Sequence, residues 1–199
     1  MRFILALAML VPIAAQADDL LEQILRHLGE SPVVRGEFVQ ERFLRAIARP
    51  TVSSGSITVS RAEGVLWRIE SPVQVALAFT PTQVIETGAD GVRRVRGERR
   101  GTQAEMARVM RGILGADVQA LSSSFEARAE GSVERWRIRL VPRAREMGAF
   151  LKAINLAGAR HLETIEIQET SGDRTAIRMR GFTIAAELAA DEREYFRVP

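Results

Sequence analysis

The sequence predicts a mainly β fold in which amphipathic helices cover an antiparallel sheet. About ten short segments have the alternation or the β-branched and aromatic content of strands. Turn residues separate these segments at short intervals, which is typical of a meander. Three further segments repeat apolar residues at helical spacing. A sheet with one apolar face needs such a covering layer, so the helices are expected to pack on it.

The N-terminus has the pattern of a signal peptide. Arg2 precedes an apolar run at residues 3–15, and Ala15-Gln16-Ala17 is the small-x-small pattern that signal peptidase accepts. The alternative, a membrane anchor, is disfavoured because the run is too short for a bilayer core of about 30 Å. We therefore expect cleavage after Ala17, leaving residues 18–199 as a single, soluble, exported domain.

The N-terminal half is predicted to form one helix and then strands. The helix is expected at residues 18–28, where apolar side chains recur at i, i+3, i+4 and i+7. These side chains are Leu21, Ile24, Leu25 and Leu28. A strand is expected at 33–48, followed by strands at 55–60, 64–70, 73–79, 82–87 and 92–96. Ala89-Asp90-Gly91 separates the last two as a hairpin turn.

The C-terminal half mixes both periodicities. Helical spacing predicts a helix at residues 102–114 and another amphipathic helical segment at 144–154. The apolar stripes are Met106, Val109, Met110 and Ile113 in the first, and Met147, Phe150, Leu151 and Ile154 in the second. Strands are expected at 125–129, 134–141, 161–168 and 174–182.

Composition and motifs argue against several function classes. The chain has no cysteine, which excludes disulfides, thiolate metal sites and a cysteine nucleophile. HExxH, GxSxG, GxGxxG and phosphate-loop motifs are absent, so we expect no enzyme, metal or cofactor. The arginine-rich run at residues 93–100 is either a solvated hairpin or a site for anionic groups. It lacks the interleaved aromatics of a nucleic-acid site.

One apolar face is visible in the stretch at residues 53–72. Ile57 and Val59 share a parity in one strand, and Val65, Trp67 and Ile69 do so in the next. Leu77 and Phe79 continue the face in the third strand, and Arg61 stands in the first turn. The pattern leaves two interpretations open: an ordinary packed core, or the lining of a pocket with Arg61 at its rim.

The same stretch carries a resemblance to a known family. Phe38-Val39-Gln40, then Ser53-Ser54-Gly55-Ser56, Ser60-Arg61, Trp67 and Ser71-Pro72 follow in order at close spacing. This order resembles the N-terminal half of the LolA family, the periplasmic carriers of outer-membrane lipoproteins. The signal peptide, the length, the strand count and the helix after the first strand block also agree with the family.

The resemblance implies an unclosed antiparallel β-barrel of about ten to eleven strands with a helical lid over a hydrophobic cavity. It implies that acyl chains of a lipidated cargo bind there, and that Arg61 latches the lid. The expected lipid-binding residues are Phe38, Ile57, Val65, Trp67, Leu77, Phe79, Met106, Met110 and Ile113. An inner-membrane transporter would be the donor and an outer-membrane receptor the acceptor, with a monomeric protein in the periplasm and no nucleic acid bound.

Three departures from the family pattern concern the cargo. Ala62 stands where proline is usual and Val65 where phenylalanine is frequent, and the segment after Asp90-Gly91 is arginine-rich. The cargo is therefore left open between a lipoprotein and another acyl product, such as an aryl polyene lipid. A periplasmic scaffold with a filled core is the alternative from a different class, and an exported hydrolase is a more distant one.

Overall fold

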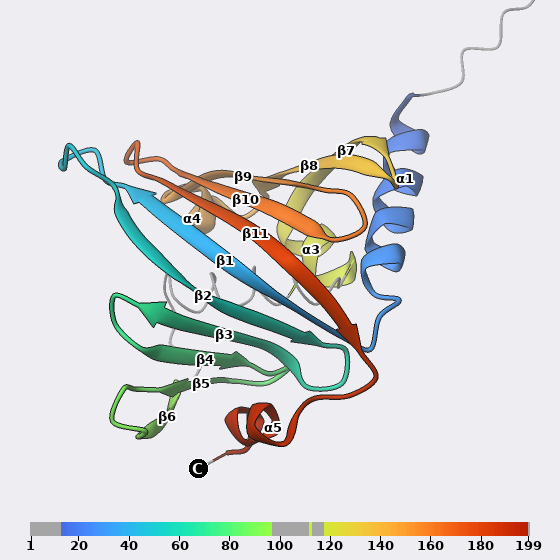
Figure 1. Ribbon diagram of the computed structural model, residues 1–199. Coiled ribbons are helices and arrows are strands. Elements are labelled where there is room, and N and C mark those ends of the chain that lie inside the picture. The colour runs from blue at the N-terminus through green and yellow to red at the C-terminus, as the bar shows by residue number, and fades with distance from the viewer. Residues whose placement is uncertain (1–12, 97–111, 113–117, 199) are drawn as a thin grey trace, which may run out of the picture.

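The computed structural model describes residues 13–96, 112 and 118–198, and these residues form one open antiparallel sheet of eleven strands (Figure 1). The strand order is β6-β5-β4-β3-β2-β1-β11-β10-β9-β8-β7, so two meanders meet at the β1–β11 pair. Because β6 and β7 are its two edges, the described sheet does not close. The predicted unclosed, mainly β architecture is confirmed.

The bounds of the elements follow the two meanders. The first consists of β1 (Val33–Phe43), β2 (Thr51–Ser60), β3 (Gly64–Ser71), β4 (Val75–Phe79), β5 (Val84–Thr87) and β6 (Arg93–Arg96). The second consists of β7 (Phe125–Ser132), β8 (Arg135–Pro142), β9 (Leu151–Gly158), β10 (Leu162–Glu169) and β11 (Arg174–Ala185). The described helices are α1 (Ile13–Leu28), α3 (Val118–Ser124), α4 (Arg145–Gly148) and α5 (Ala190–Phe196).

The larger hydrophobic core lies on one face of the sheet, which we call the inner face. Helix α1 buries Leu21, Ile24 and Leu25 against it, as their spacing predicts. Leu121 of α3 and Met147 of α4 belong to the same cluster. The α1 side chains described in this core all lie after Ala17, so the predicted cleavage would keep them.

A second, smaller core lies on the opposite, outer face. It contains Leu66, Ala78 and Ile85 of β3, β4 and β5, together with Phe196 of α5 and Leu188 just before that helix. Figure 1 shows α5 lying beside these strands. Strands β3 to β5 are therefore buried on both faces.

An ion pair fixes α5 to the sheet beside this outer core. Glu192 is only 3% exposed, and its carboxylate accepts hydrogen bonds from Arg35 Nε at 2.7 Å and Thr58 Oγ1 at 2.9 Å. Arg35 Nη2 donates a further bond at 2.5 Å, and the Ala189 amide donates one at 2.8 Å. The bonds from Arg35, followed by those from Ala189 and Thr58, outweigh burial and lower the pKa of Glu192 to about 2 from its ordinary value of 4.5.

The predicted helix at 144–154 is wrong. Only α4, a single turn, is helical there, and the chain then enters β9. Its apolar residues fit a helical stripe, but a short apolar run does not distinguish a strand from a helix. Pairing of β9 with both β8 and β10 decides for the strand, because each pairing satisfies its backbone groups.

Other boundaries also differ from the predictions. Helix α1 begins at Ile13 rather than at residue 18, and β1 ends at Phe43 rather than at residue 48. Helices α3 and α5 were not predicted at all. The predicted helix at 102–114 lies outside the described residues, apart from Gly112. The Ala89-Asp90-Gly91 turn is confirmed, with Gly91 at a φ of 74°.

Candidate functional site

The apolar inner face of β2, β3 and β4 is built from two cross-strand rows. Ile57 lies opposite Trp67, which lies opposite Leu77. In the next row Val59 lies opposite Val65, which lies opposite Phe79. Residues that face each other across antiparallel strands share one side of the sheet, so the shared face that the sequence predicted is confirmed.

Phe38 joins this face through an aromatic contact that spans three strands. Its ring lies on β1, yet its centroid is 4.0 Å from that of Trp67 on β3, with the ring planes tilted by 32°. Gly55 of β2 lies between them, directly opposite Phe38. Because Gly55 has no side chain, the two rings meet above it. A Cβ at Gly55 would also lie 1.8 Å from the Arg68 carbonyl oxygen.

The structure brings six of the nine predicted lipid-binding residues into one cluster. Phe38, Ile57, Val65, Trp67 and Phe79 are buried in it, and Leu77 packs against it partly exposed. The other three, Met106, Met110 and Ile113, lie outside the described residues. Whether any of the nine contacts lipid stays a prediction.

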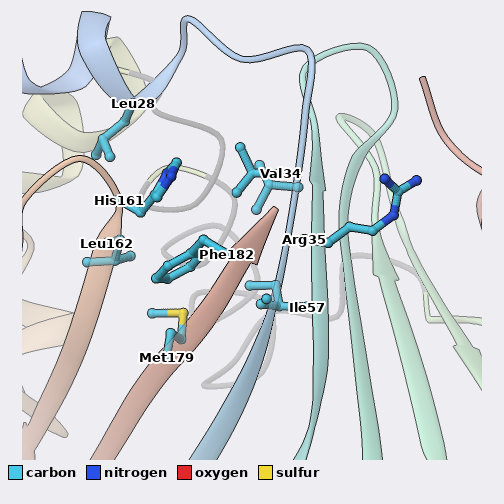
Figure 2. Close-up of a pocket in the computed structure, with 10 residues that line it drawn as sticks. Leu28, Val34, Arg35, Ile57, His161, Leu162, Met179 and Phe182 are labelled. Atoms are coloured by element: carbon cyan, nitrogen blue, oxygen red, sulfur yellow. The ribbon is translucent and has the colours of Figure 1, made fainter. Parts of the chain in front are cut away.

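One cavity adjoins this face where the end of α1 meets β1, β2, β10 and β11. Figure 2 shows Leu28, Val34, Ile57 and Phe182 gathered around it, while the side chain of Arg35 points away. The remaining lining residues are Gly36, Val59, His161, Leu162 and Met179. Its volume is about 50 Å³, which suits a water molecule or two rather than an acyl chain.

His161 is the titratable side chain of this cavity. Its ring packs on Phe182 with centroids 4.7 Å apart. Burial, followed by the charge of Arg160, lowers the pKa of His161 below its ordinary 6.5. His161 is therefore neutral at neutral pH and belongs to the apolar wall.

Arg61 lies in the turn between β2 and β3, next to the end of α1. Its backbone N–H donates to the Pro32 carbonyl at 3.0 Å. Its Nη2 lies 3.7 Å from where a Cβ of Gly29 would stand, just past the helix C-terminus. The side chain is exposed, and within the described part of the chain it forms no hydrogen bond or ion pair. The predicted latch stays a prediction, and the end of α1 is the part of the cover that Arg61 approaches.

The sequence analysis missed the contribution of the C-terminal meander to the same face. Trp136, Ile138 and Leu140 of β8 are buried in the inner core, and Met179 of β11 lines the cavity. The alternation of these residues with arginine was visible in the sequence and could have identified them. The predicted lipid-binding residues come only from the N-terminal meander and from the predicted helix at 102–114.

The described residues contain neither a membrane-spanning helix nor a group of metal ligands. No helix among them combines the length and the apolar character needed to cross a membrane. No group of three or more His, Asp and Glu side chains among them could hold a metal ion.

Comparison with known proteins agrees with the fold and the resemblance. Three solved structures share the fold at low sequence identity. A LolA superfamily protein from Nitrosomonas europaea matches with a TM-score of 0.52 and 9% identity over 90% of this chain and 96% of that chain. A DUF1329 family protein from Desulfovibrio piger matches with a TM-score of 0.53 and 8% identity over 92% of this chain and 96% of that chain. A chain of the MucA/MucB complex of Pseudomonas aeruginosa matches with a TM-score of 0.50 and 14% identity over 92% of this chain and 61% of that chain. No match was found among curated proteins. The family model described as "Outer membrane lipoprotein carrier protein LolA-like" matches residues 13–195. The chain therefore belongs to the LolA-like family of outer membrane lipoprotein carrier proteins.

Proposed function

We propose that this chain is a periplasmic carrier. It takes up the acyl chains of a lipidated cargo on the inner face and moves the cargo from an inner-membrane donor to an outer-membrane acceptor. It acts as a monomer, without catalysis. The observation that carries the proposal is the continuous apolar face formed by the two rows of β2 to β4 and the Phe38–Trp67 pair, in a chain of a carrier family.

The energetics of such a face suit transport. Each methylene that leaves water contributes about 0.8 kcal/mol, so long acyl chains bind strongly to an apolar surface. The cavity beside α1 has only about 50 Å³, so cargo must displace whatever covers the inner face. Closing of that cover competes with cargo and favours its release.

Trp67 offers a direct test of acyl binding. The chain has two tryptophans, so Trp136→Phe leaves Trp67 as the reporter, at the loss of one hydrogen bond to Ala159. A brominated fatty acid should bind this variant and quench Trp67 emission. Absence of binding, or binding without quenching, would contradict the carrier and would favour a scaffold with a filled core.

A matched pair of isoleucines separates binding from folding. Ile57 and Ile85 are both buried and lie on opposite faces of the N-terminal meander. Substitution of either by alanine should cost stability by a similar amount, about 2–4 kcal/mol. Only Ile57→Ala should weaken the binding of the fatty acid. Equal effects of both variants on binding would show that the probe reports stability alone.

We further propose that Arg61 favours the closed cover by acting on the end of α1. The helix C-terminus is its negative end, so a guanidinium near Gly29 stabilises α1 where it lies over the cavity. Arg61→Leu should load fatty acid normally and release it more slowly to acceptor vesicles, with Arg61→Lys intermediate. Arg49→Leu, at an exposed position of the β1–β2 loop, is the control. If Arg61→Leu released fatty acid at the wild-type rate, the latch proposal would be wrong and the carrier proposal would be unaffected.

A further inference from the structure

The outer face of the C-terminal meander carries a groove lined with arginines. Its volume is about 530 Å³, and β7 to β11 form it. Five arginines and two glutamates line it, an excess of three positive charges. The charged residues are Arg128, Glu130, Arg137, Arg139, Glu166, Arg174 and Arg178.

The groove follows from the pairing register. In one cross-strand row Arg137 of β8 lies opposite Ala157, Ala157 opposite Thr164, and Thr164 opposite Arg178 of β11. Two small side chains thus form the floor between two long ones, which stand about 14 Å apart across three strand spacings. The adjacent row runs from Arg139 through Asn155 and Glu166 to Ala176. The resulting channel runs along the strands with an arginine wall on each side.

The two walls differ in their charge balance. On the β11 side Arg178 donates to Glu41 at 2.7 Å, and Arg174 lies 3.6 Å from Glu166. On the β8 side Arg139 donates to the neutral amide of Asn155 at 2.9 Å. Arg137 has no hydrogen bond or ion pair through its side chain in the described part of the chain. Glu130 of β7 lies opposite Arg137 in the register without an ion pair between them, so Arg137 and Arg139 are two neighbouring cations that no carboxylate of the described residues pairs with.

We propose that this groove docks an extended acidic segment of a partner protein, with carboxylates at every second residue. Arg137 and Arg139 lie two residues apart on one face of β8, about 6.8 Å along the strand. An extended chain lying along β8 presents alternate side chains with the same repeat, so its carboxylates meet both guanidiniums in register. Arginine forms bidentate pairs with carboxylates, which adds selectivity for such a segment.

A recessed channel favours a peptide over a membrane surface. A lipid surface is broad and contacts side chains that protrude, whereas the floor below the arginines is formed by Asn155, Ala157, Thr164, Glu166 and Ala176. A single extended chain can reach that floor. The groove lies on the face opposite the apolar inner face, so this proposal stands or falls independently of acyl binding.

The test uses the purified chain and two labelled peptides of equal charge. One alternates glutamate and serine, and the other has the same residues in two blocks. Fluorescence anisotropy should show tighter binding of the alternating peptide. Arg137→Gln/Arg139→Gln should weaken it about tenfold or more, since two charge-assisted contacts are lost. The control Arg145→Gln/Arg160→Gln removes two exposed arginines outside the groove and should change binding less than about twofold.

Each other outcome overturns the proposal. Equal affinity for the two peptides in the wild-type chain would mean diffuse attraction, as would equal losses in the two double variants. Binding to phosphatidylglycerol vesicles that only the groove variant loses, without peptide binding, would assign the face to a membrane instead. Circular dichroism and thermal unfolding of both double variants verify the fold. Fatty-acid binding should be the same in both.

Discussion

The outer face of the sheet differs between its two meanders. In the first, Leu66, Ala78 and Ile85 are apolar and lie buried under α5. In the second, arginines such as Arg137 and Arg139 occupy the corresponding outward positions of β8 and remain exposed. In the part of the chain that the structure describes, one half of the sheet is thus covered on both faces and the other half on its inner face only.

The local sequence of the strands reflects this difference. In β3 three consecutive residues, Val65, Leu66 and Trp67, are buried, whereas β8 alternates strictly between exposed and buried residues from Arg135 to Leu140. Strands that are buried on both faces have continuous apolar runs, and strands with one wet face alternate. The continuous apolar run in the first meander therefore indicates that an additional layer packs on its outer face, and the strict alternation in the second meander indicates an exposed outer face.

The largest expected effect comes from the covered half. Leu66→Ala should lower the free energy of unfolding by about 3–4 kcal/mol, because a fully buried side chain leaves a cavity under α5. Arg137→Ala, at an outward position of β8, should change it by less than about 0.5 kcal/mol. Urea unfolding of both variants measures the contrast. Similar losses in the two would show that the outer faces are equally important for stability.

Acid should weaken the attachment of α5. The pKa of Glu192 is about 2 in the folded chain and about 4.5 when unfolded, so the folded state binds this proton less tightly. The stabilisation is present above 4.5 and is lost as the pH falls toward 2. The loss should be about 3 kcal/mol for this group. Urea unfolding across that range measures it, and Glu192→Gln should lack this component of the acid dependence.

Glu192→Gln tests the same attachment at neutral pH. We expect a loss of about 2 kcal/mol, because Arg35 loses its carboxylate while glutamine still accepts a bond from Thr58. Glu194→Gln on the same helix breaks only an exposed pair with Arg197 and should cost less than about 1 kcal/mol. Thermal unfolding compares them. Equal losses would mean that the buried pair contributes no more than a surface one.

The sequence predicts the strands better than the helices in this fold. Alternation placed Ile57, Trp67 and Phe79 on one face, and the registers of β2 to β4 agree. The helices depend on distant partners. Helix α5 has only seven residues and depends on Arg35 and the outer core, far away in the chain. The segment at 144–154 has a helical stripe but becomes β9 through pairing on both of its sides.

The sequence predicted the apolar and aromatic character of the site better than it predicted which strands contribute to it. The family resemblance identified Phe38 and Trp67, which form the aromatic pair above Gly55. It did not identify Met179 and Phe182, because they enter the site through pairing of β11 with β1 at the opposite end of the chain. The arginine groove also depends on register, since no single segment contains both Arg137 and Arg178.

The smallest effect on stability should come from the groove itself. Arg137 forms no ion pair in the described part of the chain, and the arginines around it outnumber the carboxylates, of which Glu130 lies opposite it on β7. Its charge therefore contributes little net attraction in the isolated chain. Threonine suits an exposed strand position well. Arg137→Thr should therefore leave the free energy of unfolding unchanged or raise it by about 0.5 kcal/mol at low salt, and the difference should shrink as salt screens the charges.

Arg178→Thr is the matched control on the opposite wall, because it breaks the pair with Glu41 and should cost up to about 1 kcal/mol. Urea unfolding at low and high salt measures both variants. A clear loss in Arg137→Thr at both salt concentrations would assign Arg137 a structural role and weaken the case for docking. An unchanged or raised stability would mean that folding does not require this charge, which is the expected property of a residue whose partner lies on another molecule.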